Sequence, residues 1–136
     1  MQLSSIPDWA LAGYGVAVAS VALWKGGRPE RAVGATVLVE FLTQGHVLPH
    51  VHAPHWLEQA WDIVILATCV ICALRSNRYW TIWASSFALL SVVTPALRFM
   101  PGVGWWAYLS AERVWAILLV AALLAGAWSA SRPPAR

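Results

Sequence analysis

Four histidines lie close together in the chain, and imidazole is the side chain that most often binds transition metals. They are interrupted by prolines and followed by the carboxylates Glu58 and Asp62. A neighbouring carboxylate can complete a ligand shell or orient an imidazole ring. The candidate metal ligands are His46, His50, His52, His55 and Glu58. The spacing matches no specific metal motif, so we prefer a solvated histidine-rich loop and keep the metal site as the alternative.

A tetrapyrrole is a variant of the same idea. A histidine near a helix end can ligate haem iron or a chlorophyll-type magnesium, which makes His46 and His50 candidate cofactor ligands. The two share a helical face only if the helix continues to Pro49. The remaining histidines lie in the same loop, which disfavours a bis-histidine haem within one chain. The sequence therefore leaves the cofactor unknown.

Glu40 lies in the middle of an apolar segment, where a carboxylate indicates a functional site because a charge in lipid is costly. Polar residues at helical spacing share its face: Thr36, Glu40, Thr43 and Gln44. A small oligomeric transporter or channel with Glu40 in its pathway is one interpretation. We prefer a neutral, protonated Glu40 that is hydrogen-bonded to Ser85, Ser86 or Thr94 of another helix.

The pair Cys69 and Cys72 has the C-x-x-C spacing of thiol redox proteins. The predicted helix enters from the outer face near Leu57, so Cys69 lies about 18 Å deep at the 1.5 Å rise per residue. Apolar burial suppresses thiol reactivity, and we interpret both cysteines as packing residues.

Four further charged residues form a predicted outer charge layer: Asp62, Arg98, Glu112 and Arg113. Because pairing offsets the cost of burying charge, we predict a contact of Arg98 with Asp62 or Glu112.

Five apolar segments must position these residues, over 9–24, 32–48, 57–74, 79–97 and 114–129. The chain is 60% hydrophobic and only 11% charged, far below the roughly one quarter that is usual in soluble domains. Each segment is near the lower limit of the roughly 17 to 25 residues that cross a bilayer. Tryptophans stand at segment ends, where an indole prefers the interface: Trp9, Trp24, Trp56, Trp80, Trp115 and Trp128. The sequence predicts a single-domain, all-α transmembrane bundle of five short helices.

The basic residues predict an orientation for this bundle. Seven of the nine follow the first, third and fifth segments: Lys25, Arg28, Arg31, Arg75, Arg78, Arg132 and Arg136. With five crossings they share one face, which the positive-inside rule makes cytoplasmic, with the N-terminus outside and the C-terminus inside. Because they occupy short turns rather than one polar surface, a nucleic-acid partner is disfavoured.

Two stretches of the sequence, 17–19 and 105–111, allow a second structural interpretation. The stretch 17–19 resembles a signal-peptide cleavage site, but no positively charged region precedes it, so we expect the first segment to remain a helix. After the Pro101–Gly102 break, residues 105–111 are either an interfacial stretch or the first turns of one long helix that reaches Ser129. Small residues at helical spacing predict close packing within the chain or with another subunit: Ala10, Gly13, Ala17 and Ser20 in the first segment, and Ala122, Ala125, Gly126 and Ser129 in the last.

The stretches ALRSNRYWTIWA at 73–84 and AYLSAERVW at 107–115 resemble small uncharacterised inner-membrane proteins of Gram-negative bacteria. This resemblance implies a multi-pass inner-membrane protein and supplies no activity. Without a catalytic constellation, we favour a small accessory or structural subunit of a larger inner-membrane protein complex over an enzyme. Its expected partners are membrane lipids and other membrane subunits or a second copy. A redox subunit that uses the histidines, and then the transporter or channel, are the alternatives.

Overall fold

The computed structural model describes residues 7–43 and 55–132 and is all-helical over these ranges, as the sequence predicts. The described residues form five α-helices and one short 3-10 helix, with no strand: α1 (Asp8–Lys25), α2 (Arg28–Thr43), α3 (His55–Arg75), α4 (Tyr79–Val93), η2 (Thr94–Phe99) and α5 (Trp105–Ala130).

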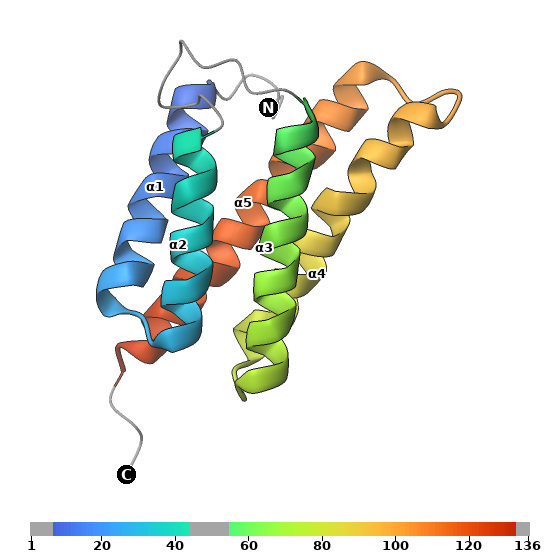
Figure 1. Cartoon of the computed structure of the whole chain (residues 1–136). Coiled ribbons are helices and arrows are strands. Elements are labelled where there is room, and N and C mark those ends of the chain that lie inside the picture. The colour runs from blue at the N-terminus through green and yellow to red at the C-terminus, as the bar shows by residue number, and fades with distance from the viewer. Residues whose placement is uncertain (1–6, 44–54, 133–136) are drawn as a thin grey trace.

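Two antiparallel helix pairs, α1–α2 and α3–α4, stand next to each other, and α5 crosses behind them (Figure 1). Short connections make consecutive helices neighbours. The long α5 packs closely on α4 and α1 and more lightly on α2, while α2 makes the direct contact with α3. Helix α5 therefore joins the two pairs along their length.

The turn between α1 and α2, the turn between α3 and α4, and the end of α5 lie at the same end of the bundle (Figure 1). We call it the basic end because these connections carry six basic residues of the described chain: Lys25, Arg28, Arg31, Arg75, Arg78 and Arg132. The opposite, mixed-charge end carries Arg98 and Arg113 together with Glu58, Asp62 and Glu112. The charge asymmetry of the sequence is thus an asymmetry of the folded bundle.

The prediction that all five helices are membrane spans is wrong. Within the described residues, three helical segments are long and apolar enough to cross a membrane: Trp56–Arg75, Tyr79–Phe99 and Trp105–Ala130. The apolar part of α1, Trp9–Lys25, is shorter. Helix α2 has 16 residues, about 24 Å at 1.5 Å per residue, and it includes Arg28, Glu30, Arg31 and Glu40. Length and charge together remove α2 from the set of candidate spans.

Prolines explain how the chain leaves α4 and enters α5. Pro95 has no N–H to continue an α-helical ladder, and the chain tightens there into the 3-10 helix η2. A turn follows in which the Val103 N–H donates to the Met100 carbonyl, with Pro101 second and Gly102 third. Gly102 has φ +96°, as the third position of a type II turn requires. Helix α5 then runs unbroken over Trp105–Ala130, so residues 105–111 are the start of one long helix.

Small residues form the core, but on a different face of α1 from the predicted one. Ala12, Ala19 and Ala22 are buried, and a side chain at Gly34 of α2 would meet the Ala22 methyl group at 3.1 Å and the Ala19 carbonyl oxygen at 3.2 Å. Larger residues of the other helices complete this core: Val33, Val37, Ile65, Trp80, Leu119 and Leu123. On the predicted face, Gly13, Ala17 and Ser20 are exposed in the single chain and Ala10 is half-buried.

Two tryptophans also depart from the predicted interfacial belt. Trp9, Trp24, Trp56 and Trp128 are each at least 64% exposed near helix ends, where lipid head groups would meet them. Trp80, in contrast, is the second residue of α4 but is only 8% exposed. Trp115 is half-buried in the interior of α5, because that helix begins at Trp105, nine residues before the predicted start of the segment at 114.

Candidate functional site

A buried carboxylate at the basic end is the most unusual polar group in the described chain. Glu30 lies in the first turn of α2 and is 0% exposed. Glu30 can pack here only because residue 26 is a glycine. A side chain at Gly26 would lie 2.5 Å from the Glu30 Cβ and would clash with it. A buried charge in a membrane protein must be paired or hydrogen-bonded, and its location marks a functional or architectural centre.

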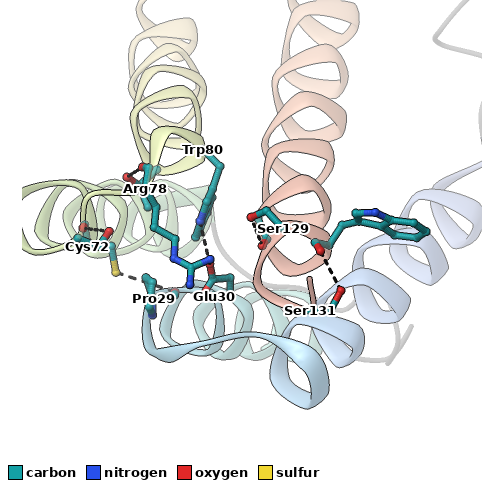
Figure 2. Close-up of polar contacts among 11 residues, drawn as sticks. Pro29, Glu30, Cys72, Arg78, Trp80, Ser129 and Ser131 are labelled. Carbon is teal, nitrogen blue, oxygen red and sulfur yellow. Dashed lines mark hydrogen bonds and ion pairs between the residues drawn. The ribbon is translucent and has the colours of Figure 1, made fainter. Parts of the chain in front are cut away.

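Two residues of the second helix pair bind Glu30 (Figure 2). The Trp80 indole N–H donates to Glu30 Oε1 at 2.9 Å, and Arg78 Nη1 lies 3.3 Å from the same oxygen. The second oxygen, Oε2, is buried without a hydrogen-bond partner among the described residues. It lies 3.0 Å from the point that a Gly27 side chain would occupy. Charge-assisted bonds therefore tie the first helix pair to the beginning of α4.

The Trp80 ring packs against Gly126 of α5. A side chain at Gly126 would lie 2.6 Å from the Cδ2 and Cε2 atoms of the Trp80 ring, so the indole packs directly on the α5 backbone. Beside it, Cys72 Sγ lies 4.0 Å from the Pro29 carbonyl oxygen, which places α3 against the start of α2. We call Glu30, Arg78, Trp80 and Gly126 the basic-end latch, because they connect α2, α4 and α5.

A second polar cluster lies at the mixed-charge end. Arg98 Nη2 donates to the Tyr108 hydroxyl at 2.7 Å, and that hydroxyl donates to Glu112 Oε1. The Arg98 guanidinium lies 4.4 Å from the centre of the Tyr108 ring and 5.7 Å from that of Trp105. Stacking and hydrogen bonding together hold this side chain over the first turn of α5.

The predicted contact of Arg98 was with Asp62 or Glu112, and the structure places Tyr108 between Arg98 and Glu112. Asp62 of α3 lies near two other carboxylates, Glu112 of α5 and Glu58 of its own helix, and like charges repel one another. Arg113 is half-buried beside Glu112 on α5. The predicted charge layer is therefore brought to one end of the bundle, with an unanticipated tyrosine as its connecting group.

Glu40 lies in the last described turn of α2, nearer the mixed-charge end than the middle of the helix. The Thr36 and Thr43 hydroxyls donate to carbonyls of their own helix, at Ala32 and Val39. The three hydroxyls predicted as partners of Glu40 donate to carbonyls of α4, four residues earlier in each case: Ser85 to Thr81, Ser86 to Ile82 and Thr94 to Leu90. Gln44, the last member of the stripe, lies outside the described residues.

Most of the histidine cluster also lies outside the described residues. This applies to His46, His50 and His52, while His55 begins α3 and Glu58 follows in its first turn. Over residues 7–43 and 55–132, no group of three or more histidine, cysteine or acidic side chains is arranged to hold a metal ion. Cys69 is buried and Cys72 half-buried, both as free thiols.

Sequence reasoning missed Glu30. An acidic residue in the first turn of a helix usually stabilises the helix dipole at the surface, so its position alone attracts no attention. The available signal was its isolation, since among the described residues it is the only acidic one at the basic end. Comparisons add no further guide, since no family model, curated protein or solved structure matches the chain.

Proposed function

We propose that this protein is a small accessory subunit of a larger membrane assembly, which it joins through the exposed face of α1. The supporting observation is the environment of Gly13, where an added side chain would meet nothing within 4 Å. Ala17 and Ser20 are exposed on the same face, with Trp9 and Trp24 at its two ends. Helices in lipid associate where small residues let their backbones approach, and G-x-x-x-A is such a spacing.

The composition of the first helix pair supports the same proposal. The segments of α3, α4 with η2, and α5 are long and apolar enough to anchor the chain, whereas α1 and α2 are not. A helix that inserts poorly alone is stabilised by packing against protein on more than one side. The basic-end latch provides one such contact and a partner helix on α1 would provide the other. The partner is a transmembrane helix of another subunit or of a second copy.

The charge asymmetry supports an orientation for this subunit. We propose that the basic end faces the cytoplasm of a bacterial inner membrane, with the N-terminus outside and the C-terminus inside. Six basic residues and one buried acidic residue occupy that end of the described chain, while acidic residues outnumber Arg98 and Arg113 at the other. Loops rich in arginine and lysine are retained on the cytoplasmic side.

The Gly13→Leu variant tests this assignment. A leucine projects from α1 without a clash inside the chain, so we expect unchanged or slightly higher thermal stability, since leucine favours helix more than glycine. The leucine blocks close approach of a partner helix, and we expect association to weaken at least about tenfold, or about 1.4 kcal/mol. Native mass spectrometry after mild solubilisation measures the assembled fraction against the 14.8 kDa single chain.

The matched control is Ala35→Leu, a similar enlargement at an exposed position of α2. We expect it to leave the assembly intact. A wild-type protein that is a single chain in both mild detergent and native-lipid particles would contradict the proposal. An assembly that survives Gly13→Leu unchanged would contradict the assignment of the α1 face.

A further inference from the structure

A half-open cavity of about 330 Å³ lies between the end of η2 and the beginning of α5. It is lined by Leu97, Arg98, Val103, Gly104, Trp105 and Tyr108, and includes no residue of α1. The walls are mainly apolar, and Arg98 is the only charged side chain among them. Glu112, which accepts a hydrogen bond from the Tyr108 hydroxyl, is not part of the lining.

The Arg98 side chain is held in place with most of its donors free. A guanidinium has five N–H groups. One nitrogen, Nη2, donates to Tyr108, and the other two have no hydrogen-bond partner within the described ranges. The rings of Tyr108 and Trp105 fix the orientation of the group, while the residue itself stays exposed. A fixed guanidinium with free donors suits bidentate binding of a phosphate.

The position of the cavity indicates where such a phosphate comes from. The cavity joins the ends of two candidate spans, Tyr79–Phe99 and Trp105–Ala130, and therefore lies at the depth of lipid head groups. Exposed apolar residues directly follow its lining residues Arg98 and Trp105 in the chain: Phe99 is 89% exposed, Met100 57% and Trp106 68%. Such side chains beside a cationic cavity favour a ligand with hydrocarbon chains attached to its charged group.

We propose that this cavity binds the head group of an anionic phospholipid, with the phosphodiester on Arg98 and the acyl chains along the apolar rim. A zwitterionic lipid fits less well. Its ammonium would lie close to the guanidinium, and the faces of Tyr108 and Trp105 that could bind it are already used by Arg98. The site therefore selects lipids by the net charge of the head group.

Lipid titration of the delipidated protein, followed by native mass spectrometry, tests the site. The probes are phosphatidylglycerol and phosphatidylcholine with the same acyl chains. For the wild type we expect saturable phosphatidylglycerol binding at least about tenfold tighter than phosphatidylcholine binding. Arg98→Gln removes this preference. The control Arg75→Gln loses the same charge at an exposed residue of the basic end and keeps the preference.

A second variant leaves Arg98 in place. Val103→Trp places a larger side chain at a lining residue of the cavity, in the turn before α5. We expect it to abolish the preference, with the helix content by circular dichroism unchanged. Equal affinity for both lipids, or an Arg98→Gln variant with wild-type selectivity, would overturn the proposal. Displacement of the lipid by millimolar inorganic phosphate would also overturn it, because the site would then recognise a free anion.

Discussion

Replacing Arg78 with methionine is expected to lower the free energy of unfolding by about 2 to 3 kcal/mol. The change leaves the fully buried Glu30 carboxylate without its ion-pair partner, and removal of one partner of a buried pair costs about 3 to 5 kcal/mol. The Arg78 side chain is 40% exposed, so solvent already screens part of this interaction, and we expect a loss at or below the lower end of that range. Unfolding in mixed micelles, followed by far-ultraviolet circular dichroism, measures the loss.

Arg75→Met is the matched control, since Arg75 lies three residues before Arg78, at the end of α3, and is exposed. We expect it to change stability by less than about 0.5 kcal/mol. A Glu30→Gln variant should cost less than Arg78→Met, because the amide oxygen still accepts the Trp80 N–H and the charge left without a partner is that of Arg78, which is 40% exposed to solvent. Equal losses for Arg78→Met and Arg75→Met would show that the latch does not support the fold.

Replacing Gly126 with alanine is expected to cost about 2 kcal/mol, although alanine favours helix over glycine by about 1 kcal/mol. The new methyl group would lie 2.6 Å from two ring atoms of Trp80, and overpacking of this kind costs about 1 to 3 kcal/mol. The indole cannot yield freely, because it is 8% exposed and hydrogen-bonded to Glu30. Displacing it therefore also weakens the Glu30 bond.

Gly13→Ala is the identical change at a helical position with no neighbour within 4 Å. There we expect a gain of up to about 1 kcal/mol from helix propensity alone. The two variants, compared in the same micelles, should differ by about 3 kcal/mol. If Gly126→Ala were as stable as Gly13→Ala, Trp80 would not pack on α5 as described.

Several features were predictable because they depend on local chemistry. Apolar runs of this length form helices, short turns make neighbouring helices antiparallel, and the basic residues therefore gather at one end. Asp62, Arg98 and Glu112 lie at a common end of the bundle, because each is near the same end of its helix. The central linking role of Tyr108 was not anticipated, since its hydroxyl is used only when η2 and α5 meet.

The sequence by itself determined the helical class, the short turns after the first and third apolar segments, and the asymmetry of charge. Only the tertiary structure decided which small-residue face of α1 is buried, because α1 carries small residues on two sides and periodicity cannot choose between them. It also decided that Glu30 and Trp80 are interior partners. They are 50 residues apart, and each resembles an ordinary helix-end residue until α2, α4 and α5 converge and exclude water from the space between them.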